Sequence, residues 1–307
     1  MEQGTSMWLS EKIAAGRFIV CAELGPPQSS DDKAIRAKAG YFRGRVDAVN
    51  ITDNQTAVAR LSSIAAAKIL LDEGMEPIMQ MTCRDRNRLA IQSDLLGAAA
   101  LGITNVLCLT GDHQKFGDQP EAKGVFDLDS IQLIATVSAM NRGFLLSGVE
   151  LKKAPSFLIG AAAKPFAQPF EMRLIRLHKK VQAGAHFIQT QPVFDVELFT
   201  RWMQRVVEMG LHEKTAILAG VLPVKSAKAL EWMKKEVPGM KIHDSYIQRM
   251  KQARDPEEEG VKMAVELIQA LKTIEGVRGI HLMPALWESI TPRIVKEAGL
   301  RNASGKK

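Results

Sequence analysis

Two carboxylates have the surroundings that acid–base chemistry needs. Glu23 ends an apolar run and precedes Gly25-Pro26-Pro27, a rigid turn that fixes where the acid points. A carboxyl in such a place suits general-acid work, although it would also serve as an acceptor for loop amides. Asp112 follows Thr110-Gly111, where the glycine lets the backbone approach a ligand closely, although Asp112 would also cap the following turn. Glu23 and Asp112 are therefore the candidate catalytic residues.

Other chemistries lack their residues. The six histidines show neither an HExxH motif nor a paired-ligand spacing, so we expect no metal site. GxSxG, P-loop and GxGxxG motifs are absent from the sequence. Lysine-dependent aldolase chemistry needs a lysine inside a strand, where the sixth expected strand has Gln189 and Gln191. Lys179-Lys180, at the end of the preceding helix, is either a phosphate contact or a solvated helix end.

Short β-branched runs alternate with amphipathic helical stretches along the chain, which predicts a parallel sheet with crossover helices. The expected strands are Arg17–Leu24, Ala48–Asp53, Pro77–Cys83, Asn105–Gly111, Phe157–Ala163, His186–Gln191, Ala216–Pro223 and Gly279–Ala285. The expected helices are Ala57–Glu73, Arg86–Leu101, Asp127–Arg142, Phe170–Ala183, Glu197–Met209, Ala227–Glu236, Glu257–Ile274 and Ser289–Gly299. Eight strands close a barrel, whereas an open doubly wound sheet has fewer. We therefore predict a single-domain (β/α)8 TIM barrel over residues 1–307, with an N-terminal helix in 1–16 and a polar tail at 301–307.

Polar residues recur on one face of six of these strands. Because side chains alternate across a strand, residues two apart share a face. One parity gives Cys21 and Glu23, Asn50 and Thr52, Gln80 and Thr82, Cys108 and Thr110, Gln189 and Gln191, and His281 and Met283. Each set lies at the C-terminal end of its strand, which in a barrel lines the mouth. Barrel interiors tolerate hydrogen-bonded polar layers, but so many polar groups are hard to bury without a ligand. We expect a polar cavity that holds a bound molecule.

The composition restricts the class of protein. Apolar residues make up 46% and charged residues 24% of the chain, as in an ordinary globular protein. No apolar run reaches about 18 residues and no secretory signal is visible, so we expect a cytoplasmic protein without a membrane partner. Cys21, Cys83 and Cys108 lie in apolar runs, which indicates reduced core thiols. The net charge of +7 comes from basic residues interleaved with acids, which favours an anionic small molecule over nucleic acid.

Several of these segments together resemble the methylenetetrahydrofolate reductase family, the flavin-dependent barrel enzymes of one-carbon metabolism, from Arg17 to Leu300. In chain order they are Ala22-Glu23 with Pro26-Pro27, Thr82-Cys83, Gly111-Asp112, Lys180–Ala185 with Thr190-Gln191 and Phe194-Asp195, and Gly220–Val224. Each segment by itself is weak evidence for the family, whereas their order and spacing on the expected strands are specific to it.

The resemblance implies reduction of 5,10-methylenetetrahydrofolate to 5-methyltetrahydrofolate by hydride transfer from N5 of a bound flavin, FAD or FMN. It implies that Glu23 is the general acid that helps to open the imidazolidine ring of the folate substrate. Asp112 then lies beside the flavin pyrimidine and the pterin, and Gln191 contacts the folate. The expected cofactor-binding residues are Thr52, Gln80, Thr82, Thr110, Gly111, Asp112, Lys164, Lys179 and Lys180.

The sequence also departs from the better-known bacterial enzymes. Thr52-Asp53-Asn54 replaces Thr-Tyr-Gly, Ala227 replaces an aromatic that stacks on the nicotinamide or pterin, Arg173 replaces an acid, and Trp287 replaces an arginine. The pattern resembles the short reductases of anaerobic and acetogenic bacteria, which work beside an iron–sulfur partner subunit. The electron donor is therefore NAD(P)H or such a subunit, and we expect a homo- or hetero-oligomer. Two other hypotheses stay open, an electron-relay or structural subunit of a redox complex and a pterin-binding methyltransferase barrel.

Overall fold

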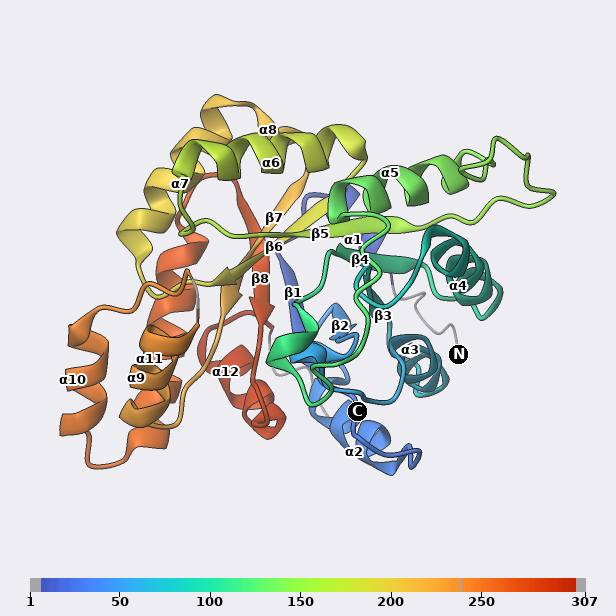
Figure 1. Cartoon of the computed structure of the whole chain (residues 1–307). Helices are drawn as coiled ribbons and strands as arrows, with labels where there is room; N and C mark the ends of the chain where they lie inside the picture. The colour runs from blue at the N-terminus through green and yellow to red at the C-terminus, as the bar shows by residue number, and fades with distance from the viewer. Residues whose placement is uncertain (1–6, 238, 302–307) are drawn as a thin grey trace, which may run out of the picture.

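Eight parallel strands close into a barrel in sequence order. In the computed structural model, which describes residues 7–237 and 239–301, each strand pairs with its sequence neighbours and β8 returns to pair with β1 (Figure 1). The strands are β1 (Ile19–Leu24), β2 (Ala48–Ile51), β3 (Pro77–Thr82), β4 (Asn105–Leu109), β5 (Leu158–Ala163), β6 (Phe187–Pro192), β7 (Ala216–Val221) and β8 (Val277–Leu282). This is the predicted single-domain (β/α)8 TIM barrel, and the fold prediction is confirmed.

Helices follow the strands and surround the barrel (Figure 1). The α-helices are α1 (Leu9–Ala14), α2 (Lys33–Phe42), α3 (Ser63–Asp72), α4 (Arg88–Ala100), α5 (Ser130–Asn141), α6 (Phe170–Ala183), α7 (Val196–Glu208), α8 (Leu211–Lys214), α9 (Ala227–Glu236), α10 (Asp244–Gln252), α11 (Pro256–Lys272) and α12 (Thr291–Glu297). Three short 3-10 helices are η1 (Gln55–Ala57), η2 (Gln114–Phe116) and η3 (Glu288–Ile290).

Three helices were not expected from the sequence, namely α2, α8 and α10. The buried residues of α2 are Ile35, Ala39 and Phe42, an apolar stripe that is narrow for a helix packed on a barrel. Those of α10 are Ile247 and Met250. Such thin stripes give a weak periodic signal, and α8 has a single turn.

Of the two terminal segments predicted from the sequence, residues 1–6 and 302–307 lie outside the described residues.

Helix α3 begins later than predicted. The expected start was Ala57, whereas the helix starts at Ser63, because the Ser62 hydroxyl accepts a hydrogen bond from the Ala65 amide at 3.2 Å. A serine in this position satisfies a backbone donor that the first turn leaves without a partner. The residues before it form the loop after β2, which contributes to the cavity described below.

Two buried layers of side chains hold the barrel together. An outer cluster joins the strands to the surrounding helices. The inner cluster consists of Leu9, Ile19, Cys21, Ala48, Ile78, Leu107, Phe187, Ala216 and Leu218. Phe187 fills the space above Gly160 on the neighbouring strand, where an added Cβ would lie 2.2 Å from the phenyl ring. The half of the lumen near the N-terminal ends of the strands is therefore a packed core.

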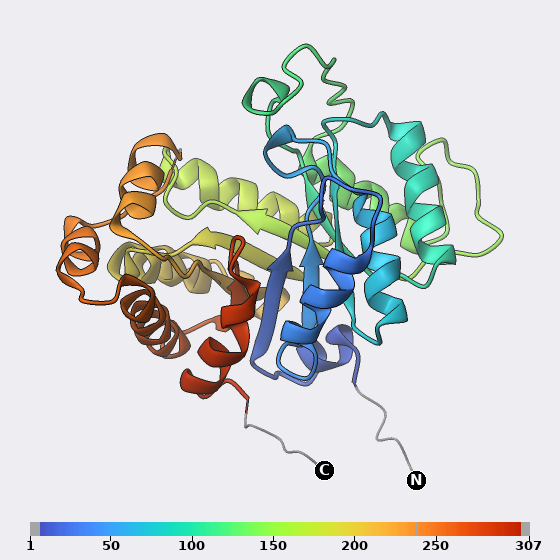
Figure 2. The ribbon, with the colours of Figure 1, turned by 90° about the horizontal axis from the view of Figure 1, so that it is seen from below.

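The N-terminal end of the barrel is closed by α1. Leu9 is fully buried, and its amide donates to both carboxylate oxygens of Glu76, at 2.8 and 3.0 Å. Lys12 of the same helix lies 3.2 Å from Asp47. The loops that follow the strands form the opposite end, toward which the arrowheads of β1 and β2 (blue) point in Figure 2. Any ligand site of the lumen must open at that end.

The predicted inward face was wrong for one strand, β4. Leu107 belongs to the inner cluster, whereas Cys108 belongs to the outer one. Thr110 shares the parity of Cys108, and its hydroxyl accepts a hydrogen bond from the amide of Ser130, the first residue of α5, at 3.1 Å. Apart from Asn105 at its start, β4 is apolar on both faces, so the sequence did not indicate which face is inside. All three cysteines are nevertheless buried and free, as expected for core thiols.

Candidate active site

A reciprocal pair of amides forms the floor of the open half of the lumen. Asn50 of β2 donates to the Gln189 side chain at 2.6 Å, and Gln189 of β6 donates back to Asn50 at 2.9 Å. Both residues are buried, and they come from strands on opposite sides of the barrel. Their mutual hydrogen bonds satisfy polar groups that would otherwise be costly to bury. The pair separates the apolar core from the polar mouth above it.

Glu23 stands in this polar mouth. Its side chain is 17% exposed, and three polar side chains from different segments surround its carboxylate. Gln55 and Gln80 approach it with their amide nitrogens at 3.4 and 3.5 Å, and His281 of β8 lies 3.6 Å away. The carboxyl is thus oriented by side chains and still reachable from the mouth. This placement fits an acid that meets a bound molecule.

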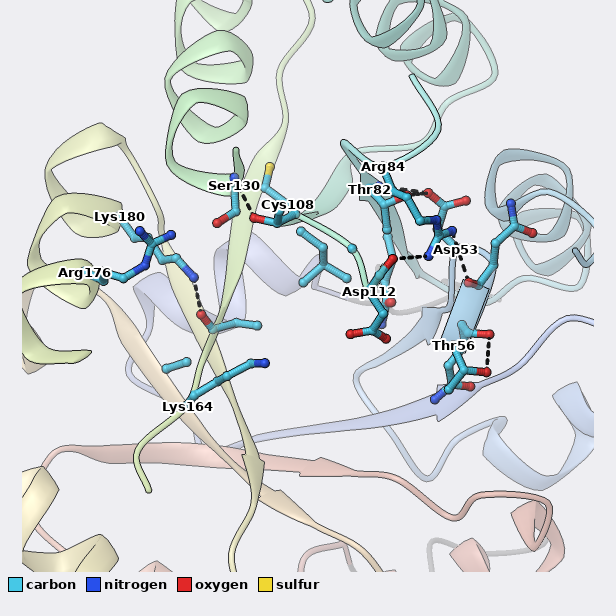
Figure 3. Close-up of a pocket in the computed structure, with 18 of the residues that line it drawn as sticks. Asp53, Thr56, Thr82, Arg84, Cys108, Asp112, Ser130, Lys164, Arg176 and Lys180 are labelled. Atoms are coloured by element: carbon cyan, nitrogen blue, oxygen red, sulfur yellow. Dashed lines mark hydrogen bonds between the residues drawn. The ribbon is translucent and has the colours of Figure 1, made fainter. Parts of the chain in front are cut away.

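The structure has a cavity of about 460 Å³, a volume typical of a cofactor or drug-sized ligand. Figure 3 shows the residues that line it. Gln80 lines it and also faces Glu23, so the two features adjoin. Seven of the nine predicted cofactor-binding residues line this cavity, namely Gln80, Thr82, Thr110, Gly111, Asp112, Lys164 and Lys180.

The other predicted site residues lie outside this lining. Lys179 is exposed on α6 and does not line the cavity, whereas its neighbour Lys180 does. Thr52 and Gln191 lie in the barrel mouth, and each has a buried oxygen that accepts no hydrogen bond within the described chain. Both oxygens are therefore free to accept a hydrogen bond from a further molecule in the mouth.

One end of the cavity is strongly basic. Arg173, Arg176 and Lys180 of α6 and Lys164 after β5 line it, and Figure 3 shows Lys164, Arg176 and Lys180 on the side opposite Asp112. The Lys180 ammonium donates to the Ala162 carbonyl at 2.5 Å. Burial and the nearby Arg176 lower the pKa of Lys180 to about 8. An anionic group such as a phosphate would relieve this concentration of positive charge.

Sequence reasoning missed Arg173 and Arg176 as members of this basic end. The sequence prediction paired Lys179 with Lys180, but adjacent residues of a helix face different directions. Positions 173, 176 and 180 follow the helical spacing that places side chains on one face. Helical periodicity applied to the basic residues would therefore have selected Arg173, Arg176 and Lys180 together.

The opposite wall is held by Arg84, which is 2% exposed. Its guanidinium donates to the carbonyls of Asn54 at 3.2 Å and Asp112 at 3.4 Å, and it pairs with Asp85 at 2.7 Å. One side chain thus ties together the loops that follow β2, β3 and β4. Gly111 has a φ of +94°, and an added Cβ would lie 2.9 Å from the Arg84 Cβ. Glycine is required here because both the conformation and the space exclude a side chain.

A buried ion pair supports the same wall. Asp53 accepts hydrogen bonds from the Thr82 amide at 2.8 Å and the Thr82 hydroxyl at 2.9 Å, and from Arg86 at 2.7 Å. Asp53 is 1% exposed and Arg86 is 15% exposed in their side chains. Arg86 also pairs with Asp94 at 2.8 Å. The sequence showed Asp53 as a departure from the family pattern, and the structure shows its partners.

Two further departures lie near the ends of β7 and β8. Ala227 is the first residue of α9 and is half-buried. Trp287 is buried to 9% exposure, with the Lys225 ammonium 4.9 Å from the centre of its indole ring. Trp287 therefore packs beneath a cation that the protein itself supplies.

Within residues 7–237 and 239–301, no group of three His, Cys, Asp or Glu side chains is close enough to hold a metal ion. In the same part of the chain, none of the helices combines the length and the apolar character that crossing a bilayer demands.

The sequence over residues 9–299 matches the family model described as methylenetetrahydrofolate reductase. The chain belongs to this family. It is 24% identical over 308 residues to the 5,10-methylenetetrahydrofolate reductase of Pectobacterium carotovorum, covering 93% of this chain and 92% of that one. It is 26% identical over 262 residues to the probable methylenetetrahydrofolate reductase (NADPH) of Caenorhabditis elegans, covering 82% of this chain and 36% of that longer protein.

Among solved structures, the fold is similar to that of a protein from Clostridium thermocellum that binds two copies of 5-methyl-5,6,7,8-tetrahydrofolic acid. The TM-score is 0.63 with 14% sequence identity, and the match covers 95% of this chain and 99% of that one. At this identity the likeness concerns the fold. The family match therefore carries the assignment.

Proposed function

We propose that this protein reduces 5,10-methylenetetrahydrofolate to 5-methyltetrahydrofolate with a bound flavin. The observation that carries the proposal is the position of Glu23 in the barrel mouth, joined through Gln80 to a cavity of cofactor size. A carboxyl that ends a barrel strand beside a ligand cavity is where barrel enzymes place their acids. Family membership supplies the reaction, and the folate ligand of the fold-similar protein agrees with it.

The cavity fits a flavin in its charge distribution as well as in its volume. Its basic end, with Arg176, Lys164 and Lys180, suits the phosphate of FMN or the pyrophosphate of FAD. Its opposite wall offers Thr82 and Asp112, polar groups suited to the ring edge of a pyrimidine. The flavin would supply the hydride. Gly111 lines the cavity, where its backbone would contact a flat ring.

The residues of the mouth perform the proton chemistry. In the proposed reaction the O–H bond of Glu23 breaks as its proton passes to a ring nitrogen of the folate, and a C–N bond of the imidazolidine ring opens. Hydride transfer to the resulting one-carbon unit then completes the methyl group. Gln191, with its unpaired oxygen, would hold an N–H group of the pterin, and the unpaired hydroxyl of Thr52 would contact the flavin. Asp112, at the edge of the cavity, would lie between cofactor and substrate.

Two electron donors would suit the proposed reaction, NAD(P)H and an iron–sulfur partner subunit. Ala227 removes an aromatic stacking platform that contributes about 1 kcal/mol or more in such contacts. We therefore favour the partner subunit as donor, with the folate half of the reaction unaffected. Reduction of the bound flavin by a viologen dye, with no reduction by NADH or NADPH, would support this choice.

The proposal is tested by reconstituting the purified chain with FMN and FAD under anaerobic conditions and reducing it with dithionite. Methylenetetrahydrofolate should then reoxidise the flavin and yield 5-methyltetrahydrofolate. Glu23→Gln should slow this step by about 10²- to 10⁴-fold. The exposed Glu197→Gln on α7 serves as the matched control and should react like the wild type.

Three outcomes would contradict the proposal. Failure to bind either flavin would exclude it and would favour a colourless pterin-binding methyltransferase barrel. Flavin binding without reoxidation by the folate would favour an electron-relay subunit. Equal rates for Glu23→Gln and the wild type would show that Glu23 is not the acid.

A further inference from the structure

A buried histidine of the barrel mouth has no structural hydrogen bond to explain it. His281 is 3% exposed on the inner face of β8, and its Nδ1 has no hydrogen-bond partner within the described chain. His186, by contrast, is satisfied at the other end of the barrel, where its Nδ1 accepts the Ile159 amide at 2.9 Å. A buried imidazole without such an anchor is uncommon, because its polar atoms lose their hydration.

Among the described residues, Glu23 has the only carboxylate within 4.0 Å of the His281 imidazole. The His281 Nε2 lies 3.6 Å from the Glu23 Oε2, a gap that a small rotation of the carboxylate closes to hydrogen-bond length. The two strands that pair with β8, β1 and β7, place no other charged side chain beside His281 at its register positions. Cys21 is the register partner of His281 on β1, and Gly220 is its partner on β7. Burial raises the pKa of the Cys21 thiol well above its ordinary value, so this neighbour stays uncharged.

The remaining ionisable groups of the eight strands point elsewhere. They are Cys108 and Arg278. Cys108 packs in the outer cluster, and Arg278 donates to the Ile13 carbonyl of α1 at the closed end of the barrel. Helix α11 covers the outer face of β8, away from the lumen. Among the strand residues, His281 and Glu23 are therefore the ionisable pair at the mouth.

The tautomer of His281 follows from this geometry. A neutral imidazole carries its proton on either Nδ1 or Nε2. A proton on Nδ1 would be a buried donor without an acceptor, whereas a proton on Nε2 points to the Glu23 carboxylate. The second arrangement leaves only a bare lone pair on Nδ1, which costs less than an unmatched donor.

We propose that His281 is a positioning residue for the acid, holding its Nε2–H toward Glu23 and stabilising the carboxylate that remains after Glu23 has given its proton to the substrate. The inference rests on the proposed function for its kinetic part. In that step the Glu23 O–H bond breaks and an N–H bond forms on the folate, while His281 keeps its own proton. The imidazole acts through Glu23 and does not touch the reacting atoms.

The first test needs neither flavin nor substrate. In the flavin-free protein at neutral pH, long-range ¹H–¹⁵N correlation spectra report the tautomer of each histidine. The His281 signal, assigned by its loss in His281→Leu, should show the proton on Nε2. Glu23→Gln should perturb this signal and leave that of His186 unchanged. A proton on Nδ1, or a signal indifferent to Glu23→Gln, would overturn the inference.

The second test uses the folate-dependent reoxidation of the reduced holoenzyme. His281→Leu should lower the rate constant about 10- to 100-fold, the usual effect of a lost hydrogen bond to a charged group, with little change in the KM for the folate. It should also move the alkaline limb of the pH–rate profile to higher pH, because the carboxylate loses its donor. His281→Gln, whose amide N–H takes the place of Nε2–H, should recover most of the rate.

The controls separate this inference from the proposed function. His186→Asn, which keeps an acceptor for the Ile159 amide, should have the wild-type rate and profile. An inactive wild type would refute the proposed function and leave the tautomer result standing. An active wild type with an equally active His281→Leu and an unmoved pH profile would refute the positioning role alone.

Discussion

The buried pair of Asp53 and Arg86 provides a quantitative test of how the cavity wall is held. Asp53→Asn keeps the shape of the side chain and removes its charge, which leaves Arg86 without its most buried partner. Breaking a buried ion pair in this way costs about 3–5 kcal/mol. Arg86 is 15% exposed and retains Asp94 at 2.8 Å, so we expect the lower value, about 3 kcal/mol.

This loss is measurable as a shift in the melting temperature of the flavin-free protein. An unfolding entropy of about 2.1 cal/mol/K per residue, over 307 residues, converts about 3 kcal/mol into a decrease of about 5 °C. Differential scanning calorimetry should detect it. Asp94→Asn is the matched control, because it removes the exposed partner of the same arginine and should cost less than about 1 kcal/mol. Equal effects of the two substitutions would refute the reasoning that burial sets the strength of this pair.

Three further outcomes are expected. Burial lowers the pKa of Lys180 to about 8 in the folded protein, from 10.5 in the unfolded chain. Between these two pH values the unfolded chain therefore binds more protons than the folded protein. The free energy of unfolding of the flavin-free protein should rise with pH across this window, by about 3 kcal/mol at most. Urea midpoints at pH 8 and pH 10 should show the rise, and Lys180→Met should abolish it. Gly111→Ala should cost about 2 kcal/mol or more and weaken flavin binding in a fluorescence titration, whereas Gly97→Ala, inside α4 with open space around it, should stabilise the protein by about 0.5–1 kcal/mol. The three buried cysteines should resist a thiol reagent such as Ellman's reagent in the native protein and react fully in denaturant, and rapid native labelling would contradict their burial.

The barrel could be predicted because its strands carry strong local signals. β-branched runs of the right length alternate with helical patterns, and their number alone favours closure. The inner face of a strand was predictable where one face is polar, as at Glu23 and Gln80, and not where both faces are apolar, as on β4. Helices with thin apolar stripes, such as α2, were missed for the same reason.

The candidate site was predictable where a residue follows a strand directly. Asp112 and Gly111 are of this kind, and both line the cavity. The ion pair of Asp53 and Arg86 joins two loops whose residues are 33 positions apart, and neither local sequence predicts this contact. The role of His281 depends likewise on the closure of β8 against β1, which makes neighbours of the first and last strands.

The sealed floor of the barrel has a kinetic consequence. Among the described residues, the apolar core and α1 fill one end of the lumen and the Asn50–Gln189 amides cross its middle, so the lumen is closed from that end. A molecule therefore reaches Glu23 from the mouth of the barrel. In the proposed reaction, the electron donor and the folate would therefore use the mouth in turn or share it. A partner protein docked over the mouth would have to move aside before each new folate enters.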